Sequence, residues 1–160
     1  MINPALRTFP LSPNGSAAED LPPAGRLTLT DLTVRQRFGI KGPGSSKWLE
    51  SQGMSLPPVN RIATQDGVKL IRLGGDDFLA IDGTAGNAVA GLTAAWNAAA
   101  SPRGYWSWRD EGWNWMRLSG PLTEAVVARL CALDLRPGRF AEDEVAQTRV
   151  AHLEAVLIRC

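Results

Sequence analysis

The sequence has few of the residue types on which catalytic and metal sites are usually built. Its only histidine is His152, which excludes a site of several histidines within this chain. Its two cysteines, Cys131 and Cys160, are too few for a disulfide framework or a zinc knuckle. The Gly-x-Ser-x-Gly turn that holds the nucleophile of many hydrolases is absent. We therefore expect no catalytic residue, no cofactor-binding residue and no metal ligand, with Cys131 packed on the apolar face of a helix.

The sequence also lacks an excess of charge of either sign. It has 17 lysines and arginines against 16 aspartates and glutamates, for a formal net charge of +1. Binding to nucleic acid or to an anionic membrane surface normally requires a basic excess. No segment reaches the ~18 consecutive apolar residues that cross a bilayer, and the first eleven residues lack the apolar run of a signal peptide. We expect a cytoplasmic protein without a nucleic-acid or membrane partner.

What the sequence does contain is typical of a folded protein. Hydrophobic residues make up 44% and charged residues 21%, the usual range for globular domains. Residues 1–25 are different, because they hold five of the eleven prolines. Proline fixes φ and removes a hydrogen-bond donor, which excludes a helix or a central strand. We predict an extended arm over 1–25 and a single α+β domain over 26–160.

Hydrophobic periodicity over 26–160 predicts short strands that alternate with single helices. The sequence Gly-Gly-Asp-Asp between two apolar runs predicts a hairpin over 68–82, and a second hairpin is predicted over 105–118. Gly53 is expected to end the first helix. The predicted fold is α+β, with a mostly antiparallel sheet covered by helices. The expected strands are 26–33, 37–41, 68–73, 78–82, 105–108, 113–118 and 147–159, and the expected helices are 45–52, 86–100 and 121–133, the last with Leu122, Val126, Leu130 and Leu133 on its apolar face.

Four of the six tryptophans lie within ten residues. In each predicted strand of the second hairpin two tryptophans are two residues apart, so both rings leave the same face and the two pairs can meet across the hairpin. The simplest interpretation is a packed core or a self-packed hairpin. Two others are an aromatic surface for another subunit and a platform for a stacked ligand. Because tryptophan and arginine are frequent interface anchors, the candidate partner-interface residues are Trp106, Trp108, Arg109, Trp113 and Trp115.

Two further patterns are weaker. Residues 39–47 superficially resemble a phosphate-binding loop, but Gly44 is followed by serine rather than lysine, and Pro43 removes a backbone N–H. We interpret them as a strand-to-helix turn. His152 and Glu154 share a face of the predicted last strand, but they lack a nucleophile or a pocket. The residues alone therefore indicate a soluble binding or structural subunit.

From about residue 28 onwards, the order and spacing of short segments resemble the gamma subunit of heterotetrameric sarcosine oxidase. The sequence departs from that pattern in the tryptophan-rich segment 105–115, and it ends at Cys160, where the family continues with a further strand and helix. The matching segments include Arg37–Gly44, Trp48-Leu49, Asn60-Arg61, Arg72–Gly74, Leu118–Pro121, Leu130–Leu135 and Ala146–Thr148.

The resemblance implies a fold similar to the N-terminal part of the folate-dependent aminomethyltransferase of glycine cleavage. It also implies alpha, beta and delta subunits as partners, in a complex that oxidises sarcosine to glycine and passes the one-carbon unit to tetrahydrofolate. FAD, FMN, NAD and tetrahydrofolate are implied for that complex and none for this chain, which is expected to have no activity alone. The alternatives are a stand-alone folate-binding protein of the aminomethyltransferase-like group, the corresponding subunit of N-methylglutamate dehydrogenase, and an independent enzyme.

Overall fold

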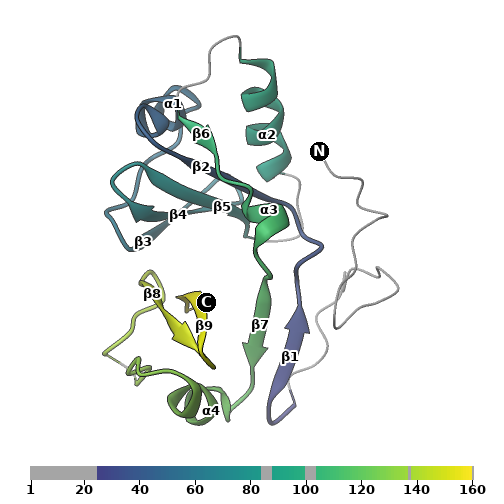
Figure 1. Ribbon diagram of the computed structural model, residues 1–160, viewed down its shortest axis with the longest axis vertical. Coiled ribbons are helices and arrows are strands. Elements are labelled where there is room, and N and C mark those ends of the chain that lie inside the picture. The colour runs from purple at the N-terminus through teal and green to yellow at the C-terminus, as the bar shows by residue number, and fades with distance from the viewer. Residues whose placement is uncertain (1–24, 84–87, 100–103, 137, 160) are drawn as a thin grey trace.

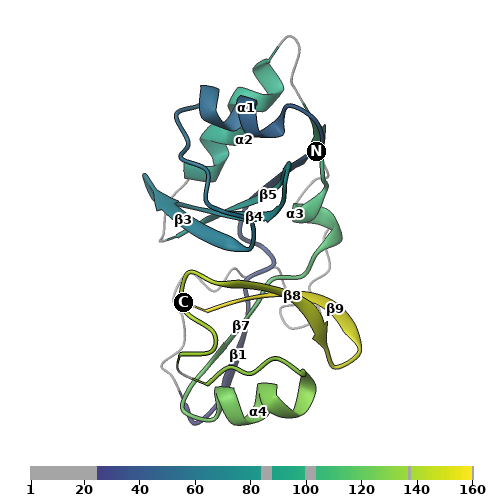
Figure 2. The same ribbon diagram turned by 90° about the vertical axis from the view of Figure 1, so that its left-hand side faces the viewer.

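The structure, a computed structural model, describes residues 25–83, 88–99, 104–136 and 138–159. Its elements form layers (Figures 1 and 2). Two helices cover one face of a five-stranded sheet, a two-stranded hairpin lies under the opposite face, and a further helix lies beyond that hairpin. The expected α+β class with mostly antiparallel sheets is confirmed. The predicted arm over 1–25 lies outside the described residues, apart from Gly25.

All strand pairs of the five-stranded sheet are antiparallel. Its spatial order is β3-β4-β5-β2-β6, so β3 and β6 are the edge strands. The predicted strand 37–41 and the predicted hairpin over 68–82 are both confirmed. The edge strand β3 was not predicted, because its residues are half-buried or exposed and carry no run of apolar side chains. The strands are β2 (Arg37–Lys41), β3 (Arg61–Gln65), β4 (Val68–Gly74), β5 (Asp77–Asp82) and β6 (Tyr105–Trp106).

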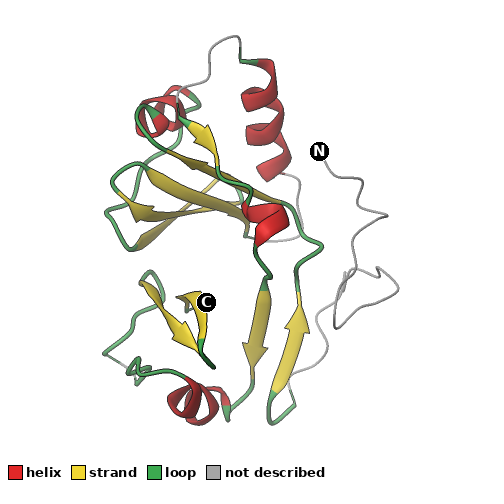
Figure 3. Ribbon diagram, viewed as in Figure 1, coloured by secondary structure: helices red, strands yellow, loops and turns green. Residues whose placement is uncertain are grey.

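The first hydrophobic core lies between this sheet and the helices α1 (Ser45–Ser51) and α2 (Ala88–Ala98), which are coloured red at the top of Figure 3. Phe38 is at its centre, with its ring centroid 5.5 Å from that of Trp48 and 6.1 Å from that of Trp96. Gly53, at a φ of +79°, follows α1 as predicted. Its N–H donates to the carbonyl of Glu50 at 2.9 Å, which satisfies a carbonyl at the helix end.

The second core lies on the opposite face of the sheet. Ile71, Leu73, Leu79 and Ile81 pack there against Val145. The chain beyond Val145 forms a hairpin, β8 (Val145–Val150) and β9 (Leu153–Ile158).

The single strand predicted over 147–159 is therefore wrong. The turn between β8 and β9 consists of Ala151 and His152, which have φ values of 48° and 68°. Such left-handed turns usually contain glycine or asparagine, so these two residues carry no turn signal. His152 lies in this turn, and the expected shared face with Glu154 is not formed.

A third pair of strands, β1 (Thr28–Asp31) and β7 (Met116–Ser119), runs beside the layers and extends from the five-stranded sheet towards the last helix (Figure 1). The turn after β7 requires glycine. Gly120 has a φ of +114°, and a Cβ atom there would lie 2.6 Å from the carbonyl oxygen of Gly25. This close backbone approach joins the start of β1 to the end of β7.

The last helix, α4 (Thr123–Leu130), begins two residues after the predicted start at Pro121. The predicted apolar face is only partly correct, because Leu122 and Leu130 are exposed while Val127 is buried. Val127 is the buried residue of α4, which contacts β8. Cys131 is buried as expected, but it lies just after the end of α4 in an extended conformation, with its sulfur 3.7 Å from the hydroxyl of Thr148.

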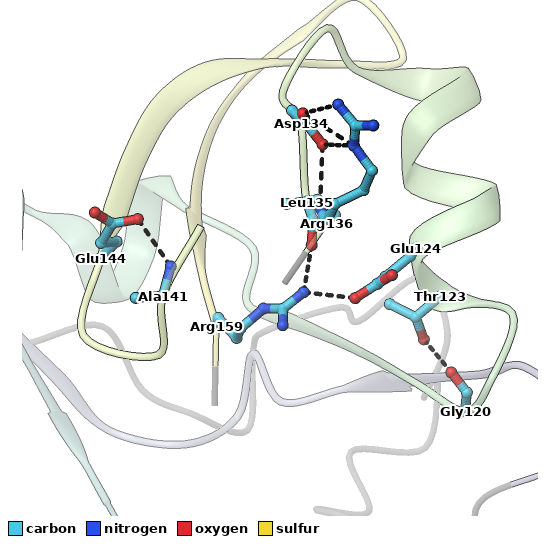
Figure 4. A network of polar contacts seen from close by, with 9 residues as sticks. All are labelled: Gly120, Thr123, Glu124, Asp134, Leu135, Arg136, Ala141, Glu144 and Arg159. Carbon is cyan, nitrogen blue, oxygen red and sulfur yellow. Dashed lines mark hydrogen bonds and ion pairs between the residues drawn. The ribbon is translucent and has the colours of Figure 1, made fainter. Parts of the chain in front are cut away.

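Polar contacts tie α4 to the hairpin (Figure 4). The Arg159 guanidinium, which follows β9, donates to the Glu124 carboxylate at 2.7 Å and to the carbonyl of Leu135 at 2.5 Å. Nearby, hydrogen bonds from Arg136 lower the pKa of Asp134 to about 2. The Arg159 contacts thus join the end of β9 to α4 and to the segment that follows α4.

The start of α1 is capped by a carboxylate from another element. Asp76, in the turn between β4 and β5, accepts hydrogen bonds from the Ser46 hydroxyl and from the Ser46 backbone N–H at 3.1 Å. These bonds lower the pKa of Asp76 below its ordinary value of 3.8. The segment 39–47 is thus the strand-to-helix turn that was predicted.

Replacement of Asp76 by asparagine is expected to reduce stability at neutral pH and to weaken the pH dependence. The folded-state pKa is depressed, so the ionised carboxylate contributes its full stabilisation above pH 3.8 and loses it as the pH falls through the lower folded-state value. Urea unfolding at pH 7 and below pH 4 measures this. Glu50→Gln, at an exposed position of α1, is the control. A pH dependence unchanged by Asp76→Asn would contradict the prediction.

Candidate partner interface

The tryptophan-rich segment does not form the predicted hairpin. Strand β6 pairs with β2, strand β7 pairs with β1, and residues between them form the one-turn helix α3 (Arg109–Gly112). The two tryptophan pairs therefore do not meet across a hairpin. The chain turns at Trp108, which has a φ of 47° and a ψ of 29°. The strands with which they pair, β2 and β1, lie far from this segment in the sequence.

The structure divides the four tryptophans into two groups. Trp106 packs on the first core, with its ring centroid 5.2 Å from that of Phe38 in an edge-to-face arrangement. Trp115 packs on the second core. Trp108 and Trp113, in contrast, keep 59% and 38% of their surface exposed. Trp108 and Trp113 are thus the exposed pair, whereas Trp106 and Trp115 are half-buried.

Arg109, predicted as an interface residue, is buried inside the chain. Its guanidinium forms an ion pair with Asp77 of β5, and it lies 4.6 Å from the ring centroid of Trp113. Burial lowers the pKa of Arg109, and the charge of Asp77 opposes that shift. The aliphatic part of the Arg109 side chain passes over Gly39 of β2, where an added Cβ atom would lie 3.0 Å from Arg109 Cγ and Cδ. The Arg109 guanidinium therefore supports the face of the Trp113 ring.

A second buried arginine holds the same helix. Arg37 of β2 donates from Nη2 to the carbonyl oxygens of Asp110 at 2.9 Å and Trp113 at 3.0 Å, one in α3 and one just after it. Its guanidinium lies 6.0 Å from the ring of Trp115. Sequence reasoning missed Arg37 and Asp77. The only available signal was a charged residue at the end of each otherwise apolar strand.

Sequence reasoning also missed Tyr105, which is 67% exposed. It precedes the four tryptophans and is paired with Lys41 of β2. Its ring lies over Gly42, where a Cβ atom would come within 2.6 Å of Tyr105 Cδ2. The candidate interface therefore consists of Tyr105, Trp108 and Trp113, supported by Arg109 and Arg37.

The described residues contain no cluster of side chains suited to binding a metal ion. Among them, no group of three His, Cys, Asp or Glu side chains could hold a metal ion. Two hollows lie open to solvent, one beside Cys131 and His152 and the other beside Lys47 and Arg72. The Arg72 guanidinium donates hydrogen bonds to backbone carbonyl oxygens, including that of Gly75 at 2.6 Å. In the same part of the chain, no helix has the length and apolar character to span a membrane.

Comparison with known proteins identifies the relatives of this fold. No protein-family model matches the chain. In sequence, the chain is 28% identical over 142 residues to sarcosine oxidase subunit gamma from Corynebacterium sp. (strain P-1), a match that covers 85% of this chain and 68% of the relative. The expected resemblance to the sarcosine oxidase gamma subunit is confirmed.

The three-dimensional comparison agrees with the sequence. The chain matches a chain of the heterotetrameric sarcosine oxidase from Corynebacterium sp. U-96, solved in complex with pyrrole 2-carboxylate, with a TM-score of 0.69. Identity is 22%, and the match covers 99% of this chain and 81% of the other. This likeness shows that the layered fold described above is shared with a chain of that oxidase.

Proposed function

We propose that this chain is a gamma-type subunit of a sarcosine-oxidase-like complex and that it acts in subunit assembly without catalysing a step itself. The observation that carries the proposal is the agreement of two comparisons, because sequence and fold both point to sarcosine oxidase over most of the chain. Its partners are alpha, beta and delta subunits, and the complex is located in the cytoplasm. Strongly exposed aromatic side chains support a role in binding.

In this proposal the complex oxidises sarcosine to glycine and transfers the one-carbon unit to tetrahydrofolate. The other subunits bind FAD, FMN, NAD and tetrahydrofolate. This chain contributes a fold with two hydrophobic cores, one on each face of the five-stranded sheet. The extended arm over 1–25 is proposed to lie across a partner subunit.

Co-expression tests the proposal. The chain, carrying an affinity tag, is produced together with the alpha, beta and delta subunits of a heterotetrameric sarcosine oxidase. We expect a coloured flavoprotein complex to co-purify, with a mass by light scattering that contains one copy of each chain. Sarcosine oxidation is expected from the complex and not from the isolated chain. Purification of this chain as a monomer, with no flavoprotein bound, would contradict the proposal.

A titration separates assembly from folate binding. The isolated chain is titrated with a reduced folate and followed by its tryptophan fluorescence. We expect no saturable change at micromolar concentrations, because the role proposed for this chain is subunit assembly and not folate binding. Micromolar binding would favour a stand-alone folate-binding protein instead.

A further inference from the structure

We draw no further inference here: the strongest candidate, the apolar face of the β1–β7 strand pair on which Leu29 and Met116 are exposed, is an unpartnered surface, and nothing in the described part of the chain shows what covers it.

Discussion

Replacing Asp77 with alanine is expected to lower the free energy of unfolding by about 3 kcal/mol, the lower end of the range for breaking a buried ion pair. The Arg109 side chain is only 6% exposed, and Asp77 is its carboxylate partner. Removal of Asp77 leaves the guanidinium buried without a counter-charge. The lower end applies because the Asp77 side chain is 34% exposed, so water reaches the remaining charge. Urea denaturation at pH 7 measures the loss.

The double variant Asp77→Ala/Arg109→Met distinguishes a charge effect from a packing effect. Methionine keeps much of the arginine stem above Gly39 but has no charge to desolvate, so most of the lost stability is expected to return. Its tryptophan fluorescence is expected to differ from that of the unmodified chain, because the cation beneath Trp113 is gone. A double variant no more stable than Asp77→Ala would show that the ion pair is not the source of the loss.

The second large effect is expected at Trp106. Replacement by alanine should cost about 3 kcal/mol, as for other large aromatic residues that line a core. The reason is the ring contact with Phe38, around which Trp48 and Trp96 are also packed. Chemical denaturation followed by far-UV circular dichroism measures the change.

Trp108→Ala is the matched control, two residues away in the same segment. It is expected to cost about 1 kcal/mol or less, the value of one aromatic pair, because most of its surface already contacts solvent. Equal losses at Trp106 and Trp108 would contradict the division of the tryptophans into core and surface groups.

The parts of the fold that sequence reasoning predicted correctly depend on near neighbours. Strand β4 has apolar residues alternating in part with charged ones, strand β5 has a continuous apolar run, and a glycine-rich turn joins them. Their pairing can therefore be predicted from this one segment of the sequence. Helix α1 ends at Gly53, the residue type that most easily adopts the left-handed conformation found there. In both cases a few adjacent residues specify the geometry.

The parts that were predicted wrongly depend on distant partners. Trp106 and Trp115 lie in one short segment, yet β6 pairs with β2 and β7 pairs with β1. The turn at Ala151 and His152 is stabilised by the hydrogen bond from the Ala151 N–H to the carbonyl of Leu130, rather than by turn-forming residues. Strand pairing and this turn both need contacts that a local pattern does not contain.

Hydrophobic periodicity was sufficient to predict an α+β fold. The order and spacing of short segments carried the resemblance to the sarcosine oxidase gamma subunit. Both are patterns along the chain and need no tertiary contact. The position of Trp113 depends on β2, because Arg37 bonds its carbonyl and Gly39 leaves room for the Arg109 side chain that packs on its ring. A side chain's exposure depends on which remote segment packs behind it, and packing forms only once the sheets are assembled. The same four tryptophans therefore became two core residues and two surface residues.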